Sequence, residues 1–318
     1  MSLPTFLIVG ERKSGTTALC RWLVHPDVYM HPLEDMNYFI EDEILATTVW
    51  RDGEVDSERW ERTHSPEHYA ELFKAAPSGV AIAEKSADLF FWKPAHERIA
   101  RFLPDCKFIV VLRQPVQRAW SHYLDELAKG EGRESLPFDE ALAREEQRAQ
   151  GSAYARLHLS YRERGCYDRS ARSFLGHVAP SCVFFLTLEQ MRKAPRESLR
   201  DVYRFIGVDP DVGLELAGTR HNEGGGTKIS RPWTRSPALE PLARAYHRAA
   251  AGIAERLVTD GTQRQQFKDF VYRPIRRSGR AMVMSERARE HLARSYRTHV
   301  DALGSLLGRE FGDWRLDE

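Results

Sequence analysis

A short apolar strand that leads into a glycine-containing loop and then into a helix is the feature that most constrains this chain. Residues 5–9 are rich in β-forming side chains and end at Gly10, as in a strand buried on both faces of a parallel sheet. After residues 10–17, apolar side chains recur at helical spacing until His25 and Pro26 end the run. This order brings backbone N–H groups and the positive end of a helix dipole to one point. The N-terminus therefore predicts an anion site, and a phosphate is its natural occupant.

The loop contains the groups that a phosphate needs. Lys13 adds a positive charge, Gly15 lets the backbone approach a ligand, and neighbouring hydroxyl groups can donate hydrogen bonds to phosphate oxygens. The candidate anion-binding residues of the loop are Arg12, Lys13, Ser14, Gly15, Thr16, Thr17 and Ala18. A plain turn whose threonines only cap the helix is the alternative.

The position of the lysine separates this loop from the P-loop of NTPases. That motif requires Gly-Lys-Ser/Thr, with the hydroxyl residue holding magnesium, whereas Lys13 follows Arg12 and precedes Ser14-Gly15. A kinase or NTPase is therefore disfavoured and stays as an alternative.

Strand-like and helix-like runs alternate along the chain. Further strands are predicted at 81–83, 107–112 and 183–188, and helices at 18–24, 66–75, 95–102, 138–149, 168–178 and 198–206, with another that begins at Pro115 and ends before a loop at 130–137. Such alternation predicts an α/β fold with a central parallel sheet flanked by helices on both faces. We expect one domain over 1–318, with an excursion at 41–64 and a helical C-terminal part at 237–318. The excursion either shapes a substrate site or is a surface loop.

Composition excludes several classes of partner. Lys plus Arg number 47 and Asp plus Glu 46, so the totals do not predict binding to nucleic acid. No apolar run reaches the roughly 20 residues that span a bilayer, and the first residues do not resemble a signal peptide, so we expect a cytoplasmic protein. The four cysteines are widely spaced and form no metal-ligand pattern, so we expect no metal.

Two segments carry a resemblance to a known family. The run Lys13-Ser-Gly-Thr-Thr17 after an apolar strand resembles the 5'-phosphosulfate loop of sulfotransferases that use 3'-phosphoadenosine 5'-phosphosulfate (PAPS). In that family an arginine at a strand end and a serine about eight residues later hold the 3'-phosphate, and these fall on Arg113 and Ser121. Both residues can converge on one anion, although alone they could be an ordinary surface arginine and serine. The resemblance implies the P-loop-like sulfotransferase fold over almost the whole chain.

Two further segments resemble the branch that modifies heparan sulfate and similar bacterial enzymes. Residues 31–39 are similar to the segment that carries the glutamate base, which falls on Asp35, with Glu34 as the alternative. Asn37 stands where that family usually has a histidine. Lys85 matches a lysine that lies near the transferred group, although without the resemblance it would be interpreted as a solvated lysine paired with Glu84.

Later parts of the chain add weaker signals. Tyr167 matches a tyrosine that supports the nucleotide region, and core packing is an equal alternative. Residues 220–228 resemble the loop that closes over the adenosine phosphate, with Gly226, Thr227 and Lys228 as contacts. A connector without this role is the alternative.

The resemblance implies a cytoplasmic, bacterial-type enzyme that moves a sulfonate group from PAPS to a hydroxyl or amine, without a metal. The expected acceptor is a small molecule, glycan, glycolipid or secondary metabolite, and adenosine 3',5'-bisphosphate (PAP) is the product. Lys13 and Lys85 would neutralise charge while Asp35 or Glu34 deprotonates the acceptor. A non-catalytic protein that binds phosphorylated or sulfated ligands is a second alternative. The acceptor, the choice between O- and N-sulfation and the oligomeric state are open at this point.

Overall fold

The computed structural model describes residues 3–40, 65–128, 134–151, 153–219 and 282–314. Nearly all of them belong to one compact unit formed by Met1–Leu127, Gly132–His221 and Met284–Glu318. The excursion at 41–64, the predicted closing loop and most of the C-terminal part lie outside the described residues. The expectation of one domain over the whole chain stays a prediction.

Five parallel strands form the sheet, in the order β2-β3-β1-β4-β5. Their bounds are Phe6–Gly10 for β1, Val28–Glu34 for β2, Ala81–Lys85 for β3, Lys107–Leu112 for β4 and Val183–Thr187 for β5. The four predicted strands are confirmed. The sequence analysis missed β2, which contains Pro32 and lies at an edge, where a residue without a backbone N–H is tolerated.

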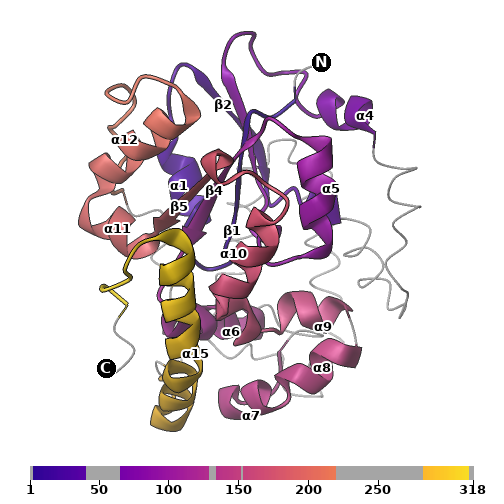
Figure 1. The fold of residues 1–318 in the computed structure, drawn as a ribbon, viewed down its shortest axis with the longest axis vertical. Helices are drawn as coiled ribbons and strands as arrows, with labels where there is room; N and C mark the ends of the chain where they lie inside the picture. Colours follow the sequence, from indigo (N-terminus) through magenta and orange to yellow (C-terminus); the bar gives the residue numbers. More distant parts are fainter. Residues whose placement is uncertain (1–2, 41–64, 129–133, 152, 220–281, 315–318) are drawn as a thin grey trace, which may run out of the picture. The chain divides into compact units, whose positions relative to one another are not determined.

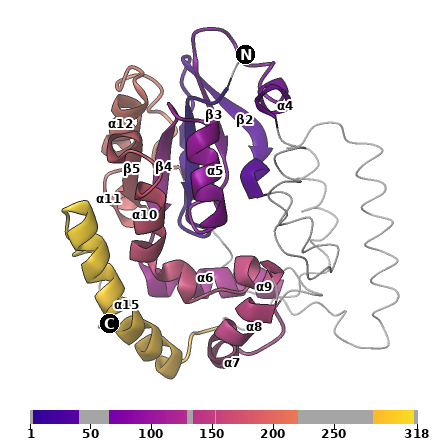
Figure 2. The same ribbon diagram turned by 45° about the vertical axis from the view of Figure 1, so that its right-hand side comes forward.

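Helices cover both faces of the sheet, as predicted (Figures 1 and 2). One face packs against α1 (Thr16–Trp22), α11 (Leu188–Lys193) and α12 (Pro195–Ile206). The other face packs against α5 (Pro94–Phe102), α10 (Tyr167–Leu175) and α15 (Glu286–Leu307). Alternate residues of each strand point to opposite faces, so a strand buried on both sides must be apolar throughout. This requirement explains why β1 reads as a continuous apolar run.

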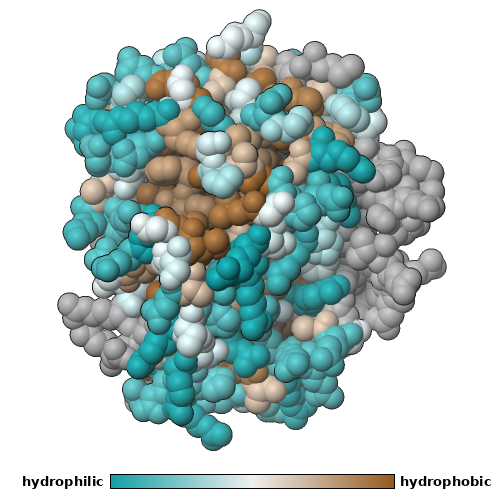
Figure 3. Space-filling view, viewed as in Figure 1, coloured by the Kyte–Doolittle hydropathy of each residue, from teal (hydrophilic) through white to brown (hydrophobic). Residues whose placement is uncertain are grey.

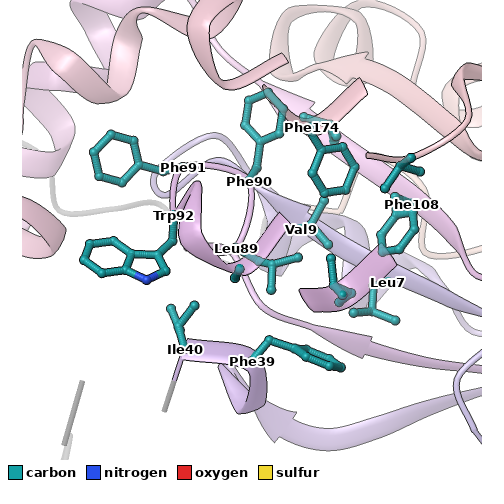
Figure 4. Packing of buried hydrophobic residues seen from close by; sticks show 14 of the residues in the cluster. Leu7, Val9, Phe39, Ile40, Leu89, Phe90, Phe91, Trp92, Phe108 and Phe174 are labelled. Atoms are coloured by element: carbon teal, nitrogen blue, oxygen red, sulfur yellow. The ribbon is translucent and has the colours of Figure 1, made fainter. Parts of the chain in front are cut away.

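The core on the face covered by α5, α10 and α15 is rich in aromatic residues. In Figure 4, Leu7 and Val9 of β1 lie beside Phe108 of β4 and Phe174 of α10. The loop after β3 adds Phe90, and rings meet edge to face, as in the Phe108–Phe174 pair with centroids 5.2 Å apart. The backbone N–H of Phe90 donates to the carbonyl oxygen of Val9 at 2.8 Å, which holds the loop after β3 against the end of β1.

The other α-helices of the described residues are α4 (Pro66–Glu71), α6 (Pro115–Ala128), α7 (Phe138–Ala143), α8 (Glu145–Gly151) and α9 (Ala153–His158). The prediction of one helix over 138–149 is wrong, because the chain turns at Arg144. The turn directs Glu145 inward, where its carboxylate accepts the backbone N–H groups of Arg162 and Glu163 at 2.7 and 2.8 Å. Figure 2 shows α6 to α9 beneath the sheet, at the end where β4 leads into α6.

The described C-terminal part is helical, as predicted. Ser285 caps α15 by accepting the backbone N–H of Ala288, and Gly308 ends the helix in a left-handed conformation with φ 61°. In the face drawn in Figure 3, apolar residues gather between α12 and α5, and polar residues cover most of the lower half. None of the described helices has the length and apolar character that crossing a membrane requires.

Candidate functional site

The loop between β1 and α1 has the geometry of an anion site. Gly15 caps α1 with φ 99°, and Lys13 is also left-handed, with φ 68°. A Cβ on Gly15 would lie 2.7 Å from Leu188 Cδ1, and one on Gly10 would lie 2.8 Å from Phe90 Cβ. Gly10 is therefore required by space, whereas the Leu188 side chain can rotate away and Gly15 is required by its left-handed conformation. Left-handed backbone at a lysine is unusual and is typical of functional loops.

The two segments predicted to hold phosphates meet in the structure, although 100 residues separate them along the chain. Arg113 Nη1 donates a hydrogen bond to the carbonyl oxygen of Lys13 at 3.2 Å. The Tyr167 hydroxyl donates to the carbonyl oxygen of Arg113 at 2.8 Å. Tyr167 is buried, so it supports the end of β4 from the side of the core.

Arg113 is a cation whose charge is poorly compensated. Burial and the nearby Arg192 lower its pKa, which Glu189 partly offsets. Among the described residues no carboxylate forms an ion pair with it. A half-buried guanidinium in this situation favours an incoming anion.

Ser14 is a second group that fits an anion. Its backbone N–H is bonded to the carbonyl oxygen of Glu11 at 3.0 Å, and its side chain is fully buried. Burial raises the pKa of Tyr167 and the nearby Ser14 hydroxyl lowers it, but the Tyr167 hydroxyl donates its hydrogen bond to the backbone carbonyl oxygen of Arg113. Within the described residues, Ser14 Oγ has no hydrogen-bond partner. A buried hydroxyl in this state is stabilised by a ligand that accepts a hydrogen bond from it.

Lys85 joins the predicted base to the loop. Its ammonium group donates to Asp35 Oδ2 at 2.8 Å and to Thr17 Oγ1 at 3.3 Å, and its side chain is 3% exposed. The interpretation of Lys85 as a solvated lysine paired with Glu84 is therefore wrong. Three predicted site residues from β3, α1 and the end of β2 are brought together.

Asp35 is held by a strained turn after β2. Asp35 and Asn37 have φ 53° and 52°, and Asp35 Oδ1 accepts the backbone N–H of Ala87 at 3.2 Å. The backbone N–H of Asn37 donates to Ser86 Oγ at 2.9 Å. Asp35 is about half exposed, so a substrate can reach its carboxylate. The side chain of Glu34, the alternative base, lies outside the described residues.

Behind Lys85 lies a carboxyl group of a different kind. Glu84 is fully buried, and its carboxylate accepts hydrogen bonds from Ser86 Oγ at 3.3 Å. Burial raises the pKa of Glu84 to about 7. The two neighbouring residues of β3 thus point to opposite sides of the strand.

Arg12 does not join Lys13 and Arg113 in the anion site. Its guanidinium binds both carboxylate oxygens of Asp88, at 3.0 and 2.5 Å, and Glu126 Oε1 at 3.0 Å. Burial works to lower the pKa of Arg12, but Asp88 and Glu126 raise it well above its usual range. Arg12 therefore anchors the loop to Asp88 and Glu126.

A buried ion network continues from this anchor and was missed by the sequence analysis. Arg164 binds Glu11 Oε1 at 2.5 Å and Asp88 Oδ1 at 2.7 Å, with all three side chains buried. Burial would raise the pKa of Asp88, but Arg12 and Arg164 hold it well below its usual range. The sequence held one indication that Arg164 has a structural role, because it stands directly before the Gly165-Cys166-Tyr167 segment.

Helix α6 contributes one predicted residue and one missed residue. Ser121, predicted to contact the 3'-phosphate, is half-buried on α6. One turn later, Asp125 Oδ1 accepts a hydrogen bond from Lys13 Nζ at 2.9 Å. The sequence could have indicated Asp125, because it lies four residues after Ser121 and so on the same face of the helix. Thr16 and Ala18 lie in α1, and Gly226, Thr227 and Lys228 fall outside the described residues.

No group of three or more His, Cys, Asp or Glu side chains in the described ranges is placed to hold a metal ion.

Comparisons with known proteins agree with this geometry. A family model described as the sulfotransferase family matches residues 4–211. Mouse heparan sulfate glucosamine 3-O-sulfotransferase 3B1 is 27% identical over 279 residues, which cover 86% of this chain and 62% of the relative. Mouse bifunctional heparan sulfate N-deacetylase/N-sulfotransferase 3 is 26% identical over 231 residues, which cover 68% of this chain and 23% of the relative. The chain thus spans at most about three fifths of the length of these relatives.

A solved structure supports the fold. The sulfotransferase from Alicyclobacillus acidocaldarius matches with a TM-score of 0.67 and 24% identity, covering 99% of this chain and 100% of that one. The predicted fold class is confirmed by this likeness and by the five-stranded parallel sheet.

Proposed function

Because this chain belongs to the sulfotransferase family, as the match over residues 4–211 shows, we propose that it transfers a sulfonate group from PAPS to a hydroxyl or amine acceptor. One observation carries the proposal: Arg113 donates a hydrogen bond to the carbonyl oxygen of Lys13 at 3.2 Å. This contact puts a cation with no carboxylate partner in the described residues beside the loop at the helix N-terminus. Two anionic groups of one nucleotide can then bind side by side.

The donor is held at both ends in this proposal. The backbone N–H groups and hydroxyls of residues 13–17 bind the 5'-phosphosulfate, with Ser14 Oγ available to donate. Arg113 and Ser121 bind the 3'-phosphate, which ATP lacks. Tyr167 positions Arg113 through its carbonyl oxygen. The arrangement therefore favours PAPS over ATP.

The transfer step follows from the two lysines and Asp35. Asp35 takes the proton from the acceptor, whose oxygen or nitrogen forms a bond to sulfur as the bond from sulfur to the 5'-phosphate oxygen breaks. Lys13 neutralises the charge that develops on that leaving oxygen, and Lys85 neutralises charge on the sulfonate oxygens. The products are the sulfated acceptor and PAP. Glu34 remains the alternative base.

The acceptor is proposed by class. The printed names of the two mouse relatives refer to heparan sulfate and, for one of them, to glucosamine. For this chain we propose a glycan, glycolipid, small molecule or secondary metabolite with a free hydroxyl or amine. The half-exposed carboxylate of Asp35 supports an acceptor that approaches from solvent.

Calorimetry with two nucleotides tests the donor. Wild-type protein should bind PAP and should prefer it to ATP with magnesium, and Arg113→Ala should weaken PAP binding at least about 10-fold, because a charge-assisted contact is lost. Arg204→Ala, which removes an exposed arginine of α12, is the matched control and should bind PAP like wild type. Preference for ATP, or indifference to Arg113→Ala, would contradict the proposal.

Transfer itself separates an enzyme from a silent binder. Purified protein is incubated with PAPS and a panel of glycans, amino sugars and hydroxylated small molecules, and PAP formation is measured. If the protein binds PAP but forms no PAP from PAPS with any acceptor of the panel, it is a binding protein and not an enzyme.

A further inference from the structure

Two consecutive cations of the phosphate loop face two consecutive carboxylates of α6. Arg12 pairs with Glu126 at 3.0 Å, and Lys13 pairs with Asp125 at 2.9 Å. We propose that Asp125 is a positioning residue that holds the Lys13 ammonium group before PAPS binds and releases it to the donor. This inference rests on the proposed function, because it assigns Lys13 to the 5'-phosphosulfate.

The two pairs differ in burial, and this difference separates their roles. The Arg12 and Glu126 side chains are 15% and 0% exposed, and separating such charges leaves an uncompensated buried ion. The Lys13 and Asp125 side chains are 33% and 30% exposed, so water can solvate each of them after separation. The first pair is therefore a permanent anchor, and the second is exchangeable.

The exchange requires only side-chain rotation. The backbone of Lys13 is held by Arg113 at its carbonyl oxygen, and its neighbour Ser14 is held by a backbone bond to Glu11. Lysine has a flexible stem of four carbons, and partly exposed side chains change rotamer within nanoseconds. The ammonium group can thus leave Asp125 without a change in the loop.

The position of Asp125 on α6 puts the pair beside the donor. Residues four apart lie on the same face of a helix, so Asp125 shares a face with Ser121. Ser121 is the residue proposed for the 3'-phosphate, and Lys13 is proposed for the other end of the nucleotide. Asp125 therefore contacts Lys13 from the face of α6 that also carries Ser121, and in this proposal it competes with the donor for Lys13.

Removing this competitor should tighten donor binding. Partly exposed ion pairs contribute little, so Asp125→Asn should lower the Kd for PAP by about 2- to 5-fold. Asp125→Glu keeps the charge, and its Kd should stay close to that of wild type. Glu197→Gln is the matched control, because it removes one carboxylate from an exposed 3.0 Å pair with Arg204 on α12.

A double-mutant cycle distinguishes competition from simple repulsion between Asp125 and the nucleotide. The Kd for PAP is measured by calorimetry at low salt for wild type, Asp125→Asn, Lys13→Met and the double variant. Competition for Lys13 predicts that Asp125→Asn tightens binding clearly more in the wild-type background than in the Lys13→Met background. Equal improvement in both backgrounds would mean repulsion alone and would overturn the inference.

The outcomes also separate the inference from the function. A wild-type protein that binds PAP without any gain from Asp125→Asn refutes the role of Asp125 and leaves the proposed function standing. A wild-type protein that binds no PAP refutes the proposed function, and the role of Asp125 with it.

Discussion

Replacing Arg164 with methionine should destabilise the protein strongly, because it removes the centre of the buried ion network. Arg164 contacts Glu11 at 2.8 and 2.5 Å, Asp88 at 2.7 Å and the carbonyl oxygen of Leu157 at 2.7 Å. Asp88 keeps Arg12 as a partner in the variant. Within the described part of the chain, Glu11 keeps the backbone N–H of Arg12 as its one partner, at 2.7 Å. Removing one partner of a buried pair typically costs about 3–5 kcal/mol, and methionine retains much of the packing volume.

Urea denaturation measures this loss as a change in the free energy of unfolding. Arg169→Met is the control, because Arg169 forms a 2.9 Å pair with Glu163 in which the side chains are 51% and 34% exposed. The control should lose at most about 1 kcal/mol. Adding Glu11→Gln to Arg164→Met should restore part of the loss, since it removes the unpaired charge. A loss for Arg164→Met no larger than that for Arg169→Met would refute the reasoning.

Three further changes test the site. Burial raises the pKa of Glu84 from 4.5 to about 7, so the folded protein loses stability as the pH rises through this interval. Glu84→Gln should remove about 3 kcal/mol of this pH dependence, measured as the free energy of unfolding in urea between pH 4.5 and 8. Gly15→Ala should weaken PAP binding about 5- to 30-fold by calorimetry, because φ at this position is 99° and the new Cβ would lie 2.7 Å from a leucine carbon. The control Gly312→Ala places its Cβ in open space and should bind PAP like wild type. Asp35→Asn should lower kcat about 10²- to 10⁴-fold with PAP binding unchanged; if only Glu34→Gln does so, Glu34 is the base.

The sequence predicted the parts of the site that depend on local order along the chain. The loop that follows Gly10 and the position of Arg113 both follow from an apolar run, because each run marks a strand whose end is visible in the sequence. Parallel strands end at the same edge of a sheet, so these groups had to lie near one another. The contact between Arg113 and Lys13 agrees with that expectation.

Other parts could not be predicted, because no local pattern records them. Pro32 and the lack of alternation concealed β2, whose position depends on pairing with β3 at the sheet edge. The single helix predicted over 138–149 fails because Glu145 caps a distant turn. The direction of Arg12 was open in the loop sequence, since a flexible side chain can reach a ligand or a buried carboxylate equally well.

The sequence alone determined the order of strand, loop and helix. It also determined which charged side chains follow β1 and β4. Only the tertiary structure decided which charges pair: Arg12 with Asp88, Lys13 with Asp125, and Lys85 with Asp35. Backbone periodicity is a local property, because it depends on neighbouring residues. Ion pairs join side chains that are 50 to 112 residues apart here, so they exist only after the sheet has brought its loops to one edge.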